Sequence, residues 1–196
     1  MIELTRKEQE ALILIYKDCT QYYSATKISK QLDLTQVGAL KLLRRLEKSK
    51  MLIKRNIGKA VIYKINEGYE LTKKALEFAL VNQASDYERW KEEFKSLNKD
   101  SRIIIFYGSA SRNYAQANDI DVLVILQKEE VRELNKALEK IQLSLPKKLH
   151  SIKATKQDLI KNIAEKNTAM LEIIKTGIVL SGYSAYMEVL NEFSGF

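Results

Sequence analysis

The chain has 196 residues and a formal net charge of +8, with 33 Lys or Arg against 25 Asp or Glu. Its single cysteine, Cys19, excludes an internal disulfide, and no secretory or transmembrane run is present, so we expect a cytoplasmic protein without membrane contact. Residues 1–75 carry a net charge of +8, whereas residues 76–196 are neutral. This asymmetry is typical of a chain in which one module meets a polyanion.

The N-terminal part predicts three helices followed by a β-hairpin. An apolar stripe predicts a helix over 5–17, Ser24 can cap a second, short helix, and residues 36–48 predict a third. Two strand-like runs, 51–55 and 60–65, follow, and a turn that contains glycine joins them. Cys19 is expected to be a small core or surface residue of the first helix.

The third helix has two unlike faces, because leucines gather on one side and basic residues on the other. Three helices and a basic hairpin in this order resemble the winged helix-turn-helix domains of prokaryotic transcriptional regulators. In that family the third helix enters the major groove of DNA and the hairpin wing contacts the flanking backbone. The resemblance assigns DNA contacts to Gln36, Val37, Lys41, Arg44, Arg45 and Lys48 on the helix, and to Lys54, Arg55 and Lys59 on the wing.

Other interpretations of this basic surface stay open. Charged residues on an amphipathic helix are commonly just solvated, and winged helices also serve as protein-interaction modules. The net charge and the basic wing favour DNA. Most of these contacts would be to phosphate, so they would position the protein without defining a sequence preference.

The middle of the chain predicts a connection between two domains. Residues 71–81 predict a connecting helix, and residues 82–86 a short break. A further helix over 87–97 presents aromatic and apolar side chains at spacings of three and four, which indicates core packing rather than a cofactor site. We therefore expect a winged helix domain over 1–75, connecting helices over 76–98, and a second domain over 99–196.

The second domain contains the most informative segment, which lies between two apolar runs. The first run ends in the turn Gly108-Ser109, whose backbone amides can meet phosphate oxygens. Asp119 and Asp121 stand at the mouth of the second run, and alternation along a strand sends both carboxylates to one face. Each feature alone is common in turns. Together they predict a site for Mg²⁺ and a triphosphate, because a cation relieves the repulsion between the carboxylates.

This pattern, with Arg112 three residues after the Ser, resembles the minimal nucleotidyltransferases of the DNA polymerase β superfamily. The resemblance implies that Gly108, Ser109 and Arg112 bind an NTP, with ATP expected. It also implies that Asp119 and Asp121 are catalytic metal ligands for Mg²⁺, with two ions if the protein is catalytic. The expected fold class is α/β of the α+β type, with a winged helix domain followed by a nucleotidyltransferase-fold domain whose small mixed sheet is flanked by helices.

One part of the family pattern is missing. Members with transferase activity usually carry a third carboxylate on the next core strand, which is predicted here over 149–154 and contains no acid. The nearest acid, Asp158, is better explained as part of a helix capping box with Thr155. His150, the only histidine, lies in that strand and could act as a general base, but a half-buried structural residue is the favoured interpretation.

Two functions remain open from the sequence. The first is an enzyme that transfers a nucleotide from an NTP to a hydroxyl on a protein, an RNA or a small molecule. The second is a catalytically weak or inactive protein, either a transcriptional regulator that senses a nucleotide or an antitoxin-like protein that binds a partner. The intact Gly-Ser and Asp-x-Asp motifs favour the first, and the missing acid favours the second. The sequence does not identify the acceptor, and it leaves open whether the protein binds a protein partner or forms a homodimer.

Overall fold

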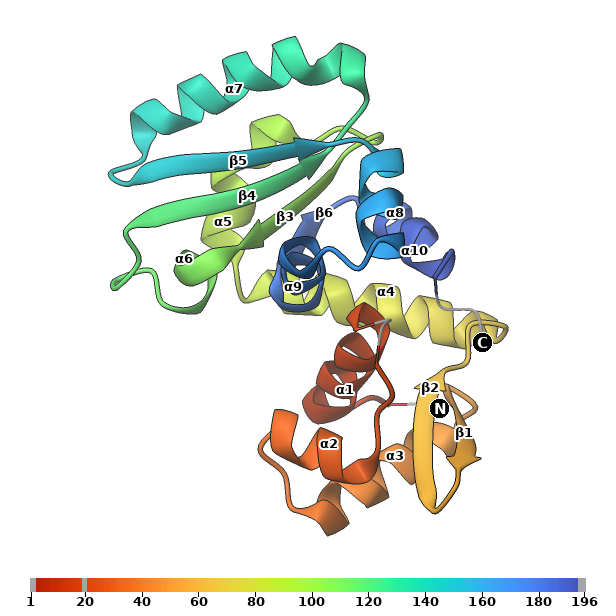
Figure 1. Ribbon diagram of the computed structural model, residues 1–196. Coiled ribbons are helices and arrows are strands. Elements are labelled where there is room, and N and C mark those ends of the chain that lie inside the picture. The colour runs from red at the N-terminus through yellow and green to blue at the C-terminus, as the bar shows by residue number, and fades with distance from the viewer. Residues whose placement is uncertain (1–2, 19–20, 194–196) are drawn as a thin grey trace. The chain divides into compact units, whose positions relative to one another are not determined.

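The computed structural model describes residues 3–18 and 21–193, and it divides into two compact units, residues 1–79 and 80–196. Cys19, and with it the expectation about its place, lies outside the described residues. The predicted fold class is confirmed (Figure 1): the first unit contains three helices and a β-hairpin, and the second a four-stranded mixed sheet flanked by helices. None of the described helices is long and apolar enough to cross a membrane.

The helices of the first unit begin where the sequence predicts, because a side chain caps each start. Thr5, Ser24 and Thr35 each accept a hydrogen bond from a backbone N–H three residues later. Gly58, with φ of +58°, lies in the tight turn of the antiparallel hairpin. The elements of this unit are α1 (Arg6–Lys17), α2 (Ala25–Gln31), α3 (Gln36–Lys48), β1 (Leu52–Ile57), β2 (Ala60–Ile65) and the first part of α4 (Glu70–Ser85).

The predicted break at 82–86 is wrong over most of its length. Helix α4 continues to Ser85, and only then does the chain turn, where the backbone N–H of Tyr87 donates to the carbonyl oxygen of Ala84. Ala84 is completely buried in the core of the second unit. The segment contains neither Gly nor Pro, so no residue forces the helix to end there.

The second unit is built on one mixed sheet with the strand order β5-β4-β3-β6. Strand β4 runs parallel to β5, whereas β3 is antiparallel to both of its neighbours. In Figure 1, α8, α9 and α10 lie in front of the sheet and α5 lies behind it. The elements are α5 (Glu88–Glu93), η1 (Lys95–Leu97), β3 (Ile103–Tyr107), α6 (Gly108–Arg112), β4 (Asp119–Ile125), η2 (Lys128–Glu130), α7 (Val131–Ser144), β5 (Lys148–Ala154), α8 (Lys156–Ala164), α9 (Thr168–Thr176), β6 (Ile178–Ser181) and α10 (Tyr183–Asn191).

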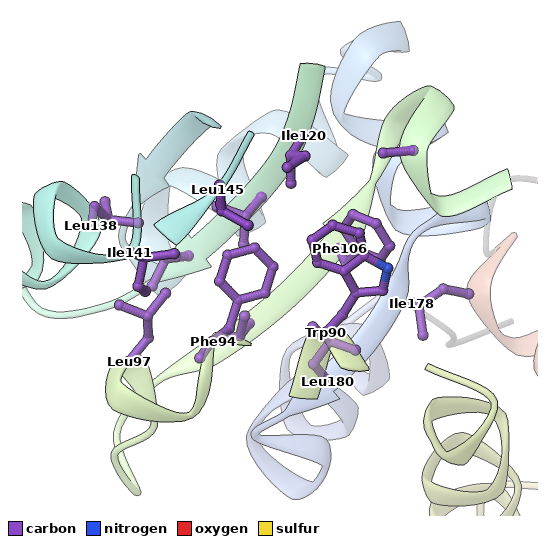
Figure 2. Packing of buried hydrophobic residues seen from close by; sticks show 14 of the residues in the cluster. Trp90, Phe94, Leu97, Phe106, Ile120, Leu138, Ile141, Leu145, Ile178 and Leu180 are labelled. Atoms are coloured by element: carbon purple, nitrogen blue, oxygen red, sulfur yellow. The ribbon is translucent and has the colours of Figure 1, made fainter. Parts of the chain in front are cut away.

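The main core of this unit confirms the role predicted for the aromatic stripe. Trp90 and Phe94 are buried against the sheet, and the ring centroids of Trp90 and Phe106 are 4.6 Å apart (Figure 2). The even-numbered residues of β3 and β4 point into this core. Because side chains alternate along a strand, the odd-numbered residues, among them Asp119 and Asp121, face the opposite side of the sheet.

Candidate functional site

Three neighbouring strands bring the candidate site of the second unit together. Tyr107 at the end of β3 pairs with Asp121 on β4, and Asp121 pairs with His150 on β5. Asp119 lies two residues before Asp121 and therefore on the same face of β4. The Gly-Ser turn follows Tyr107 directly, so the register of the sheet alone places the turn beside the Asp-x-Asp pair.

Gly108 allows this close approach. Its φ is +79°, a conformation that residues with a Cβ rarely adopt. A Cβ at this position would also collide with the carboxylate of Asp121. Backbone conformation and space therefore both require glycine here, and the backbone of the turn lies directly against one carboxylate.

The turn leads into the short helix α6, where the other predicted nucleotide ligands lie. Ser109 and Arg112 are both exposed. Within the described residues no side chain caps the start of α6, and the hydroxyl of Ser111 donates to the carbonyl oxygen of Gly108 at 2.9 Å. An uncapped helix start offers backbone N–H groups to an external acceptor such as a phosphate oxygen.

The charges of the site favour a cation. Burial raises the pKa of Asp121, and the negative charge of Asp119 raises it further, while His150 acts in the opposite direction. Burial and the same two carboxylates raise the pKa of Tyr107 to about 12. Burial is the larger cause of both shifts, and the rest comes from neighbouring negative charge, which a bound cation would relieve.

His150 belongs to this site, although the sequence favoured a purely structural role for it. Its Nδ1 is 3.2 Å from Oδ2 of Asp119 and 3.8 Å from Oδ1 of Asp121. Ligand atoms of these three side chains lie within 4.8 Å of one another, and among the described residues this is the group of three that could hold a metal ion. The sequence did not predict these contacts, because the direction of the side chain depends on the pairing of β4 with β5, which local sequence does not fix.

The first unit carries the other candidate surface, which consists of exposed side chains on α3 and the hairpin. All nine residues predicted to contact DNA are exposed, and Val37 retains 64% of its accessible surface. The structure brings them onto two adjoining elements, α3 and the β1–β2 hairpin.

These basic residues are not equivalent. Nε of Arg45 is 2.7 Å from Oε1 of Glu8, whose side chain is almost fully buried, and Lys54 pairs with Glu47 at 3.0 Å. Lys41, Arg44 and Lys48 form no ion pair with any described residue. Arg45 therefore has a structural partner that the charge pattern of the helix did not reveal.

A comparison with protein families decides the class of the second unit. Residues 88–184 match the family described as "Polymerase beta, Nucleotidyltransferase". Residues 88–184 form a polymerase beta nucleotidyltransferase domain. The match contains the Gly-Ser turn, the Asp-x-Asp pair and His150, and it confirms the family resemblance seen in the sequence.

Comparisons with solved structures and with curated proteins add no further family assignment. Three structures of Lactococcus lactis ZitR variants are similar to the chain with 14%, 16% and 14% sequence identity and a TM-score of 0.35 each. The similarity covers 74% of this chain and 77% of ZitR in the first, and 73% and 76% in the other two. No curated protein matches the chain.

Lys147 supports the nucleotidyltransferase domain in a way that the sequence did not indicate. Its Nζ donates to the carbonyl oxygens of Tyr114 and Ala117, at 2.5 Å each, and lies 4.3 Å from the centroid of the Tyr114 ring. These contacts fix the loop that joins α6 to β4, and so they fix the spacing between the Gly-Ser turn and the carboxylates. No local signal marks Lys147, because its partners are 30 or more residues away along the chain.

The nucleotidyltransferase domain has no third carboxylate on β5. Strand β5 contains no acid, and Asp158, just beyond it, forms the predicted capping box. One carboxylate oxygen of Asp158 accepts from the backbone N–H of Thr155 at 2.9 Å and from its hydroxyl at 2.8 Å. These bonds lower the pKa of Asp158 and commit it to the start of α8.

Proposed function

We propose that the nucleotidyltransferase domain binds a nucleoside triphosphate together with Mg²⁺ and transfers a nucleotide to a hydroxyl acceptor. The observation that carries this proposal is the close approach of the Gly108 turn to the Asp121 carboxylate across β3 and β4. The match of residues 88–184 supports it, because members of this family typically use Mg²⁺ and an NTP.

The residues present fit a divalent cation. Asp119 and Asp121 offer carboxylate oxygens on one strand face, and Mg²⁺ is usually held by one or two carboxylates plus substrate phosphates. Burial raises the pKa of Asp121, and the neighbouring charge of Asp119 raises it further, so a cation beside the two carboxylates would favour their charged forms. When bound, the cation supplies stabilisation of the negative charge that develops on the phosphate oxygens.

The chain itself would hold the triphosphate. In the proposed complex the backbone N–H groups of Gly108 and Ser109 and the Ser109 hydroxyl donate to phosphate oxygens, and Arg112 adds positive charge. The acceptor oxygen then bonds to the α-phosphorus, and the bond from that phosphorus to the bridging oxygen of the β-phosphate breaks. Pyrophosphate leaves, and the proton of the acceptor hydroxyl passes to water.

The absence of an acid on β5 favours a second candidate function. In that case the domain binds the nucleotide without transferring it and acts as the sensor of a regulator. Both candidates need the same binding residues, and they differ only in whether a covalent product forms.

Incubation with α-labelled ATP, Mg²⁺ and an extract of the host cell separates the two candidates. The enzyme proposal predicts a labelled product that falls by at least about a hundredfold in Asp119→Asn and in Asp121→Asn. Asp100→Asn, which removes an exposed carboxylate elsewhere in the same domain, is the control and should retain activity. Metal-dependent ATP binding without any labelled product would contradict the enzyme and support the sensor.

We also propose that the first unit binds DNA through α3 and the hairpin. The exposed basic side chains of Lys41, Arg44 and Lys48, with no ion-pair partner among the described residues, support this surface. The net charge of +8 over residues 1–75 supplies long-range attraction to a polyanion.

Fluorescence anisotropy with duplex DNA at two salt concentrations tests this surface. Replacing Lys41, Arg44 and Lys48 by Ala should weaken binding about tenfold or more and reduce its salt dependence. Lys73→Ala with Lys74→Ala removes exposed charge from α4 and should change the affinity far less. Equal losses in both variants would mean that net charge, and not this surface, accounts for the binding.

A further inference from the structure

We propose that His150 is a third metal ligand, so that the site prefers a divalent first-row transition metal such as Mn²⁺ over Mg²⁺. The inference rests on the proposed function, because it concerns the cation that Asp119 and Asp121 would hold. His150 would add a nitrogen ligand from β5 to the two carboxylates on β4, and this set of donors determines which class of metal the site prefers.

The distances fit a single shared cation. Two ligand atoms that are each about 2.1 Å from one ion are separated by about 3.0 Å when adjacent and about 4.2 Å when opposite. Nδ1 of His150 is 3.2 Å from Oδ2 of Asp119 and 3.8 Å from Oδ1 of Asp121. Both separations fall within that range, and ligand atoms of all three side chains lie within 4.8 Å of one another, so small side-chain shifts would let one ion contact the imidazole and both carboxylates.

The three ligands are also held in place and accessible. The sheet fixes their backbones, because Asp121 and His150 are paired across β4 and β5. The side chains of Asp119, Asp121 and His150 retain 35%, 18% and 44% of their accessible surface. Water or phosphate oxygens can therefore complete the coordination from the solvent side, where the Gly108 turn also lies.

Donor chemistry decides which cation the site favours. Oxygen donors alone suit Mg²⁺, whereas imidazole nitrogen suits transition metals, and the affinity of mixed sites rises along the first-row series from Mn²⁺. Two carboxylates and one imidazole are therefore expected to bind Mn²⁺ more tightly than Mg²⁺. The alternative is that His150 only forms an ion pair with Asp119 and leaves the cation to the carboxylates.

Titration of the full chain with Mn²⁺ at about pH 8, followed by electron paramagnetic resonance, separates these cases, because metal ions compete with protons for their ligands. The titration gives the Mn²⁺ affinity, competition gives the Mg²⁺ affinity, and pulsed spectra report nitrogen bound to Mn²⁺. The wild type should show nitrogen coupling and an Mn²⁺ affinity at least about tenfold above that for Mg²⁺.

Variants of β5 make the test specific. His150→Ala should lose the nitrogen coupling and weaken Mn²⁺ binding about tenfold, with a smaller effect on Mg²⁺. His150→Asp should lose the coupling and shift the preference towards Mg²⁺. Ile152→Ala, an exposed position on the same strand, is the control for folding and should behave as the wild type.

The outcomes distinguish this inference from the proposed function. If the wild type shows no nitrogen coupling, or His150→Ala leaves Mn²⁺ affinity unchanged, His150 is not a ligand. If at the same time Asp119→Asn and Asp121→Asn abolish binding of both cations, the carboxylate site of the proposed function stands. If those substitutions have no effect on cation binding either, both proposals fail. If neither cation binds the wild type without nucleotide, the inference about His150 fails, whereas the proposed function, in which phosphate oxygens complete the coordination, is tested by the titration with ATP.

Discussion

The two units hold their candidate functional side chains in different ways. In the first unit the residues extend from one face of α3 and from the hairpin that follows it, so their exposure depends on local periodicity. In the second unit the residues come from β3, β4 and β5, and only the register between strands brings them together. A surface of the first kind can be predicted from a short segment, whereas a site of the second kind depends on pairing over long stretches of the chain.

The largest effect is expected when a glycine with positive φ is replaced in each unit, Gly108 beside the carboxylates and Gly58 in the hairpin. Gly108→Ala should weaken ATP binding roughly a hundredfold, because the new Cβ meets the Asp121 carboxylate and the backbone must move. Gly58→Ala in the hairpin has open space around the same Cβ position. It should only destabilise the first unit, by about 1 kcal/mol. Calorimetric titration gives the affinities, and a folded Gly108→Ala protein with unchanged affinity would contradict the geometry of the site.

Arg44 and Arg45 test whether the basic surface is uniform. Arg45→Ala leaves the buried Glu8 carboxylate without its ion-pair partner, so the free energy of unfolding should fall by about 1 to 3 kcal/mol. Arg44→Ala should leave stability within about 0.5 kcal/mol and affect only DNA affinity. Urea unfolding of both variants measures the difference, and equal stabilities would show that the Arg45 pair contributes little.

A smaller effect, on how the free energy of unfolding depends on pH, is expected from Lys17, a buried lysine of the first unit. Burial lowers the pKa of Lys17 to about 7. Between this value and the ordinary pKa of lysine, the unfolded chain binds a proton that the folded chain does not, so the free energy of unfolding rises with pH. The rise should approach about 1 kcal/mol per pH unit between about pH 7 and 9.

Lys17→Met should remove the rise of the free energy of unfolding with pH. Lys73→Met, at an exposed position, is the control and should retain it. Urea unfolding at several pH values gives the slopes. Parallel slopes in the wild type and in Lys17→Met would show that Lys17 does not cause the dependence.

The sequence predicted the local features of both units well. Capping residues, helical periodicity and the glycine of the hairpin depend on neighbouring residues, and the Gly-Ser and Asp-x-Asp motif is contained in fourteen consecutive residues. The capping box of Thr155 and Asp158 was predicted for the same reason.

The features that the sequence did not predict depend on distant partners. His150 lies against Asp119 because β5 pairs in parallel with β4, and Lys147 reaches a loop 30 or more residues earlier. Arg45 is paired with Glu8 on another helix, although its place on α3 predicted only exposure. The extension of α4 to Ser85 likewise follows from the burial of Ala84 in a core that the segment itself does not specify.

The central claim is that the Gly108 turn and the Asp119 and Asp121 carboxylates form one site for a triphosphate and a divalent cation. The most direct measurement is calorimetric titration of the full chain with ATP, with and without Mg²⁺ or Mn²⁺. We expect the cation to strengthen ATP binding in the wild type and in Asp100→Asn, and to have no effect in Asp119→Asn with Asp121→Asn. ATP binding that is equally tight without a cation, or unchanged in the double variant, would contradict the claim.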